Sequence, residues 1–302
     1  MAKGWWDSQL APVSADTTTQ VFVINKGAGV SEIAKKLKSS GLIKSELAFK
    51  IYVKQNNLAD KIQAGSYKLS SSMSVPDLIS KLQSGSEDSW VTLIEGWRVE
   101  EMAEKLNQQL GIDKSQFLKN AKEGYMFPDT YLFPKEATAG YITETLEKTF
   151  DTRLTDDLRS KIKAKGLTEA EGVILASIVE REARSDNVRR MVASILLKRF
   201  NIGMALNADA TVQYALGYQK GEKSWWKRGL TLDDLKIDSP YNTYLHAGLP
   251  PAPISNPGLS SLKAVAEADS STPYLYYYHD SKGNSYYAKT LDEHNRNVAN
   301  HP

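Results

Sequence analysis

Hydrophobic and polar residues alternate with two different periods along the first third of the chain. Period-two runs predict short strands at 21–24 and 64–69, and helical spacing predicts helices at 31–37, at 45–55 and from 74 onward. From 90 onward the pattern predicts a strand at 90–94 and a hairpin of 274–278 with 285–287. It also predicts helices at 99–110, 142–165, 168–180, 188–200 and 259–268.

Short strands set among many helices place the chain in the α+β class. The strand–helix–helix–strand unit over 20–84 resembles a LysM-like module, a compact fold that often binds glycans; a generic α+β spacer is the alternative. The Ser- and Gly-containing linker 84–89 separates this module from a larger mixed α+β domain over 90–302, which we expect to be catalytic. We expect residues 1–19 to form a disordered juxtamembrane tail, because Lys3, Trp5 and Trp6 resemble the flank of a membrane helix.

Composition excludes several classes of function. The chain has 302 residues, a net charge of +2 and no cysteine, which removes thiol catalysis, disulfides and cysteine-based metal sites. No basic cluster interleaved with aromatic residues indicates nucleic-acid binding. The four histidines show no metal-ligand spacing, so neither a metal nor another cofactor is expected. No stretch is long enough to span a membrane, and we expect an anchor outside this sequence.

The helix 168–180 carries the most informative side chain. Thr168 and Glu171 form a capping-box pattern, and the following residues are apolar around nearly the whole helix, which predicts burial. Glu180 ends this run, and burial disfavours the charged form of a carboxyl, the condition that a general acid needs near neutral pH. The plain alternative is an ion pair with Arg181 or Arg184. Glu182 is the rival carboxyl, and it points about 200° away around the helix.

Two polar segments offer partners for a sugar. In the segment 206–214, Asp209 is suited either to cap a helix or to orient a hydroxyl, and Thr211 and Gln213 follow it. The turn-rich segment 238–244 offers stacking rings and hydrogen-bonding groups, although an ordered surface loop explains it equally well. Its four candidates are Tyr241, Asn242, Thr243 and Tyr244.

Several motifs in order resemble the YceG-like family, the MltG endolytic murein transglycosylases. The resemblance covers nearly the whole chain from about residue 20 and rests on 95–96, 127–130, 176–180, 206–214, 241–244, 248–251 and 293–295. Two positions depart from the family pattern. Ala210 stands where proline is common, and Ser285 stands where many relatives have histidine.

The resemblance implies cleavage of the β-1,4 bond between N-acetylmuramic acid and N-acetylglucosamine in peptidoglycan, with a 1,6-anhydro end as product. It also implies termination of nascent glycan chains beside peptidoglycan synthases, at the outer face of the inner membrane. Glu180 occupies the catalytic position in this interpretation, first as acid and then as base for the sugar's own C6 hydroxyl. A hydrolytic muramidase using Asp209 as a second carboxylate, and a non-catalytic peptidoglycan-binding scaffold, are the alternatives.

Overall fold

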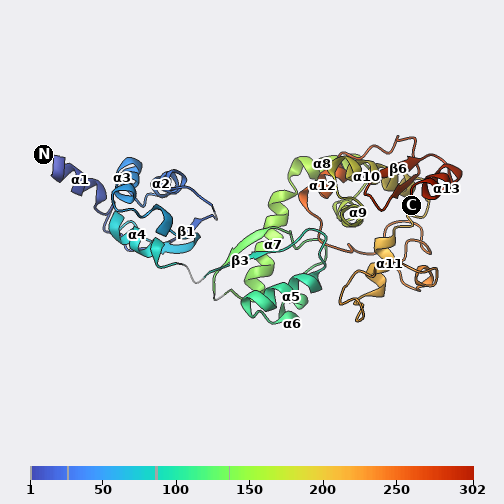
Figure 1. Cartoon of the computed structure of the whole chain (residues 1–302), viewed down its shortest axis with the longest axis horizontal. Coiled ribbons are helices and arrows are strands. Elements are labelled where there is room, and N and C mark those ends of the chain that lie inside the picture. Colours follow the sequence, from blue (N-terminus) through green and yellow to red (C-terminus); the bar gives the residue numbers. More distant parts are fainter. Residues whose placement is uncertain (1, 26, 86–87, 136) are drawn as a thin grey trace. The chain divides into compact units, whose positions relative to one another are not determined.

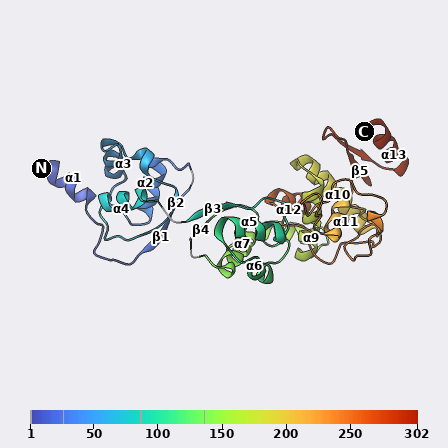
Figure 2. The same cartoon turned by 60° about the horizontal axis from the view of Figure 1, so that its bottom comes forward.

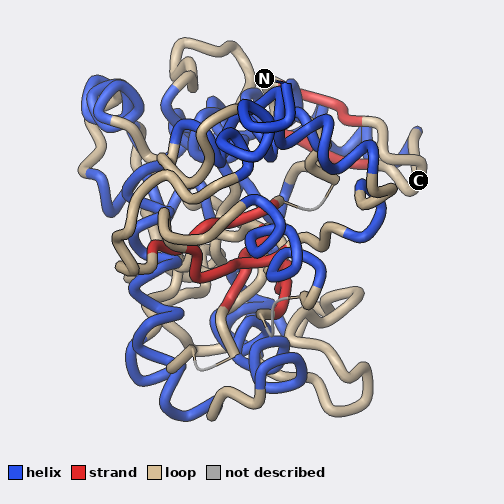
Figure 3. Tube along the Cα trace, turned by 90° about the vertical axis from the view of Figure 1, so that its left-hand side faces the viewer, coloured by secondary structure: helices blue, strands red, loops and turns tan. Residues whose placement is uncertain are grey.

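The computed structural model describes residues 2–25, 27–85, 88–135 and 137–302. The chain divides into two compact units, one of residues 1–91 with 131–137 and the other of residues 92–130 with 138–302. Helices predominate and the strands pair in short antiparallel sheets, which confirms the α+β class (Figures 1 and 3). Within the described ranges, none of the helices combines the length and the apolar character that crossing a bilayer requires.

The first unit has the predicted strand–helix–helix–strand order. Helices α2, α3 and α4 lie beside strands β1 and β2 (Figure 2). The strands pair antiparallel with Phe22 opposite Tyr67, and the core of the unit contains Leu37 and Phe49. The capping box at the start of α4 is formed by Ser74 and Asp77. Its elements are α1 (Ala2–Leu10), β1 (Gln20–Ile24), α2 (Val30–Ser39), α3 (Glu46–Gln55), η1 (Ala59–Lys61), β2 (Gly65–Leu69) and α4 (Val75–Gln83).

Two features of this unit differ from the prediction. Residues Ala2–Leu10, which we expected to be disordered, form helix α1. Strand β3 (Ser89–Thr92) pairs with β4 (Thr130–Phe133), a strand that the flanking prolines concealed in the sequence. The first compact unit includes residues 131–137 together with most of β3.

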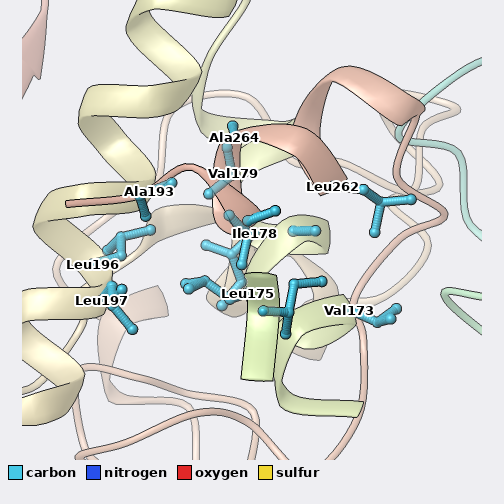
Figure 4. Packing of buried hydrophobic residues seen from close by; sticks show 14 of the residues in the cluster. Val173, Leu175, Ile178, Val179, Ala193, Leu196, Leu197, Leu262 and Ala264 are labelled. Carbon is cyan, nitrogen blue, oxygen red and sulfur yellow. The ribbon is translucent and has the colours of Figure 1, made fainter. Parts of the chain in front are cut away.

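The second unit is built around α9, α10 and α12. Buried residues of these helices interdigitate, among them Leu175, Ile178, Leu196 and Leu262 (Figure 4). The elements are α5 (Val99–Leu110), α6 (Lys114–Asn120), α7 (Ala139–Arg153), α8 (Asp156–Ala164), α9 (Glu169–Glu182), α10 (Asp186–Asn201), α11 (Asp209–Leu216), η2 (Asp234–Lys236), α12 (Leu259–Ala266), β5 (Tyr276–His279), β6 (Ser285–Ala288) and α13 (Leu291–Asn300).

The predicted helix 142–165 is two helices, α7 and α8. The Thr155 side chain accepts a hydrogen bond from the Leu158 amide and so starts α8, with Asp156 and Asp157 in its first turn. The predicted hairpin is confirmed as β5 and β6, which pair with His279 opposite Ser285. Helix α13 contacts both of these strands.

Candidate active site

The last residue of α9, Glu182, has the setting of a proton donor. Tyr277 Oη donates a hydrogen bond to Glu182 Oε2 over 3.1 Å, and the Ala210 amide approaches Oε1 at 3.5 Å. Burial raises the pKa of Glu182 to about 7, and the negative charge of Asp209 acts in the same direction. This carboxyl therefore exchanges its proton near neutral pH, as general acid–base catalysis requires.

A cavity of about 440 Å³ opens beside Glu182. Asp209, the exposed first residue of α11, lines it and accepts a hydrogen bond from Tyr244 Oη over 2.6 Å. The lining combines aromatic rings with carboxyl, imidazole and guanidinium groups, a mixture suited to a sugar. The lining residues are Glu182, Arg199, Asn207, Asp209, Tyr244, Tyr276, Tyr277, Tyr278, His279, Leu291 and His294.

The β5–β6 hairpin carries His279 into the same place. Ser285 Oγ lies 2.9 Å from His279 Nδ1, and His279 Nε2 is buried without a hydrogen-bond partner in the part of the chain that the structure describes. Burial lowers the pKa of His279, so the ring is neutral at pH 7. Because the unpartnered nitrogen is buried, His279 contributes other atoms of its ring to the cavity lining.

A second cavity, of about 450 Å³, shares Glu182 and His279 with the first. Its other lining residues come from the end of α9, the start of α10 and the hairpin turn, namely Arg181, Arg184, Ser185, Val188, Asp280, Ser281, Gly283 and Ser285. Glu182 therefore borders two hollows. An enzyme that cuts within a polymer needs room on both sides of the bond.

Glu180 faces a different environment, between α10 and α12. Its side chain is 4% exposed and forms an ion pair with Arg189, with Nη2 and Oε1 3.0 Å apart. The Gly258 amide and Ser261 Oγ donate to Oε2 over 2.9 Å and 2.8 Å. The predicted burial is confirmed, and the ion-pair partner is Arg189 rather than Arg181 or Arg184.

These contacts suit a carboxylate at the N-terminus of α12, where positive partial charge is concentrated. Glu180 lines neither of the two cavities that Glu182 borders. Glu95 lies directly against Gly258, so a Cβ at that glycine would be 1.9 Å from Glu95 Oε1. Partial burial raises the pKa of Glu95, and the negative charge of Glu180 adds to the effect.

Comparisons with known proteins identify the family of the chain. The model of the YceG-like family matches residues 22–300. The chain belongs to the YceG-like family.

Relatives of known name lie in Bacillus subtilis and Streptococcus pneumoniae, where each is called an endolytic murein transglycosylase. The first is 34% identical, with 96% of this chain and 87% of the relative covered. The second is 29% identical, with 97% of this chain but 60% of the relative covered, so this chain spans less than two thirds of its length. The crystal structure of a yceG-like protein from Listeria monocytogenes is 30% identical, with a TM-score of 0.62 over 93% of this chain and 99% of that chain.

The two positions that we expect to depart from the family pattern, Ala210 and Ser285, both lie near Glu182. Ala210 supplies the amide that approaches Glu182 Oε1, an N–H group that proline lacks. Ser285 supplies the hydroxyl beside His279 Nδ1. Ala210 therefore contacts Glu182, and Ser285 contacts His279.

Three of the residues predicted to bind substrate are buried in the scaffold. The hydroxyls of Thr211 and Thr243 lie 2.9 Å apart, and Thr243 Oγ1 accepts a bond from the Ala208 amide. The Asn242 amide group donates to the carbonyls of Leu235 and Ile237. Because these side chains are at most 1% exposed, they hold α11 and the loop 238–244 together instead of facing a cavity.

The remaining predicted residues divide between the cavity and the scaffold. Asp209 and Tyr244 line the Glu182 cavity. Gln213 Nε2 donates to the Lys227 carbonyl, and Tyr241 packs on Tyr214 with ring centroids 4.8 Å apart. Asp209 does not cap α11, whose N-cap is Ala208.

Sequence reasoning missed Tyr277, His279 and Arg199 as cavity residues. One available signal was the tyrosine run 276–278, because alternate residues of a strand face the same side. A larger cavity of about 730 Å³ lies at α5, α6 and the loop after α11, where Trp97, Tyr218 and Trp225 line it. Among the described residues, no cluster of acidic and histidine side chains is arranged to hold a metal ion.

Proposed function

We propose that this protein cleaves the glycan strands of peptidoglycan at internal β-1,4 bonds between N-acetylmuramic acid and N-acetylglucosamine, leaving a 1,6-anhydro end. The observation that carries the proposal is a carboxyl with a pKa of about 7, Glu182, at the junction of two cavities. The names of the relatives support the substrate class. Termination of nascent strands at the outer face of the inner membrane, beside peptidoglycan synthases, belongs to the same proposal.

Glu182 acts as the general acid in this mechanism. Its proton passes to the glycosidic oxygen while the bond from that oxygen to the anomeric carbon of the muramic acid breaks. The C6 hydroxyl of the same sugar then bonds to that carbon, and its proton returns to the Glu182 carboxylate. Tyr277 holds the carboxyl through its hydrogen bond, and Asp209 places a negative charge near the positive charge that develops on the sugar.

Glu180 is the competing candidate that the sequence favoured. Its carboxylate already accepts three hydrogen bonds from Arg189, Gly258 and Ser261, and no proton-donor function fits that arrangement without breaking the ion pair. We therefore assign the acid to Glu182 and a structural role to Glu180. The two assignments predict opposite outcomes for single substitutions.

Hydrolysis is the second candidate function, and Asp209 favours it. A hydrolytic glycosidase needs two carboxyl groups with different protonation states, and Asp209 is the charged group whose effect on Glu182 is the strongest. Water activated by Asp209 would then replace the C6 hydroxyl, and the product would carry a reducing end.

Product analysis decides among these possibilities. Purified peptidoglycan is incubated with the wild type, Glu182→Gln and Glu180→Gln, and the released fragments are analysed by mass spectrometry. We expect 1,6-anhydro ends from the wild type, and a loss of rate of about 10²–10⁴-fold in folded Glu182→Gln. Reducing ends would support hydrolysis, and an active Glu182→Gln would refute the assignment.

A further inference from the structure

The second cavity beside Glu182 is lined by two arginines. Arg181 and Arg184 come from the end of α9 and the loop before α10, and the hairpin turn 280–285 closes the opposite side. This cavity shares Glu182 and His279 with the cavity of about 440 Å³, so a group bound in it would lie beside Glu182.

The charge of this cavity is positive. Arg184 is exposed, and its side chain has no ion-pair partner among the described residues. Arg181 lies over the Trp226 ring at 3.8 Å, and its Nη1 reaches the Gly96 carbonyl at 3.4 Å, which fixes the guanidinium. Glu101, Glu180 and Glu182 act on its charge, so Arg184 is the freer cation of the two.

The acidic groups of the lining cancel only part of this charge. Asp280 accepts hydrogen bonds from the amides of Lys282 and Asn284, and from the side chains of Asn284 and Tyr286, all within the hairpin. Glu182 is the group that carries the proton before cleavage. With Glu182 protonated, the lining carries two guanidinium groups against the single carboxylate of Asp280, so an anion entering the cavity meets a net positive charge.

We propose that the arginine-lined cavity binds a carboxylate carried by the glycan at the sugar next to the cleaved bond, with Arg184 as its main partner. This inference rests on the proposed function. In peptidoglycan such a carboxylate has two sources, the peptide stem and the lactyl group of muramic acid when the stem is absent. N-acetylglucosamine carries none, so the cavity would distinguish the two alternating sugars and fix the register of the strand.

The experiment compares three substrates with the full chain. The substrates are strands that bear stems, the same strands with carboxylates converted to amides, and strands from which an amidase has removed the stems and exposed the lactyl carboxylate. The variants are Arg184→Gln and Arg184→Lys, with Arg190→Gln as the matched control, because Arg190 is exposed on α10 and outside the cavity.

On strands that bear stems, we expect Arg184→Gln to raise KM roughly tenfold with little change in kcat, as for the loss of one charge-assisted hydrogen bond. Arg184→Lys should retain part of the affinity, and Arg190→Gln should match the wild type. On amidated strands, the wild type and Arg184→Gln should behave alike. If Arg184→Gln raises KM only on strands that bear stems, the stem is the source of the carboxylate. If it raises KM on the stripped strands, the lactyl group is the source.

Equal KM values for the wild type and Arg184→Gln on all three substrates would overturn the inference, while cleavage by the wild type would leave the proposed function standing. A binding measurement tests the role of Arg184 even if the proposed function is wrong. Strand affinity is measured for Glu182→Gln and for Glu182→Gln with Arg184→Gln, so the contribution of Arg184 is read without any turnover.

Discussion

Glu180 and Glu182 lie two positions apart on α9 and have opposite environments. Glu180 accepts hydrogen bonds from Arg189, Gly258 and Ser261, whereas Glu182 borders the cavities and has a pKa of about 7. Two residues turn a helix by about 200°, so one side chain enters the interface with α10 and α12 and the other leaves it. The buried ion pair and the cavity-lining carboxyl are thus separated on opposite faces of the last turn of one helix.

The alkaline limb of the pH–rate profile should report Glu182. Because the reaction needs its proton, kcat/KM should fall above about pH 7. Asp209→Asn removes a charge that raises the pKa of Glu182, so the limb should move to lower pH. Tyr277→Phe removes a hydrogen bond that stabilises the carboxylate, so the limb should move to higher pH. The profile of each variant is measured on peptidoglycan strands, with Tyr287→Phe as the hairpin control.

The position of the limb, not the height of the profile, is the diagnostic quantity. A purely structural role for both residues would lower the rate at every pH and leave the limb where it is in the wild type. Shifts of the two variants in the same direction would contradict the assignment of Glu182.

Loss of the Glu180 charge should destabilise the fold. Arg189, whose side chain is 12% exposed, would be left with a buried, weakly compensated charge, and such losses cost about 3–5 kcal/mol. Chemical denaturation of Glu180→Gln, monitored by circular dichroism, measures the change in unfolding free energy. Adding Arg189→Gln should recover part of the loss. Asp157→Asn, which breaks an exposed ion pair with Lys161, should cost under about 1 kcal/mol.

Gly172→Ala in α9 should destabilise the protein although alanine favours helices. A Cβ at Gly172 would be 2.6 Å from Ile162 Cγ2, in the packed contact between α8 and α9. Overpacking of this kind costs about 1–3 kcal/mol, and Ile162→Ala in the same chain should relieve the clash. The matched control is Gly140→Ala in α7, where the nearest atom would be 3.9 Å away, and a stable Gly172→Ala would argue against the tight α8–α9 contact.

Glu123 should make stability depend on pH. Burial raises its pKa to about 8, against about 4.3 in an unfolded chain, so the folded state holds the proton more firmly between these values. The unfolding free energy should therefore decrease as pH rises from about 4.5 to about 8 and then level off. The negative charges of Glu100 and Glu101 also raise the pKa of Glu123, and the positive charge of Arg98 lowers it.

Glu123→Gln provides the comparison for this prediction. The variant lacks the titrating proton, so its stability should fall less than that of the wild type over the same pH range. Urea denaturation at pH 5 and pH 8.5 gives the two differences. If the unfolding free energy of the wild type and of Glu123→Gln depended equally on pH, Glu123 would have the same pKa in the folded and unfolded states, contrary to the prediction.

Local signals in the sequence predict much of the fold. The capping box of Thr168 and Glu171 forms as expected, and the apolar run after it is buried. The break between α7 and α8 was missed because Thr155, Asp156 and Asp157 are polar and so interrupt no apolar period. Strand β4 was missed because its partner, β3, lies about forty residues earlier in the sequence.

The candidate site was harder to predict because its chemistry depends on long-range contacts. The raised pKa of Glu182 comes from burial and from the negative charge of Asp209, while the hydrogen bond from Tyr277 acts against it. No local pattern on α9 can show these contacts. The apolar run favoured Glu180, and it did report burial correctly. Burial alone does not separate a proton donor from a buried ion pair, since the partners decide between them.

The hydrogen bond between Tyr277 and Glu182 joins segments that are synthesised at different times. Helices α9, α10 and α12 can pack around their shared core before β5 is in place, whereas the carboxyl acquires its final surroundings only when the hairpin docks. A two-stranded hairpin has little stability by itself and depends on its neighbours, here α13. During synthesis, the Glu182 carboxyl would therefore reach its final environment only after this late segment has folded onto the helices.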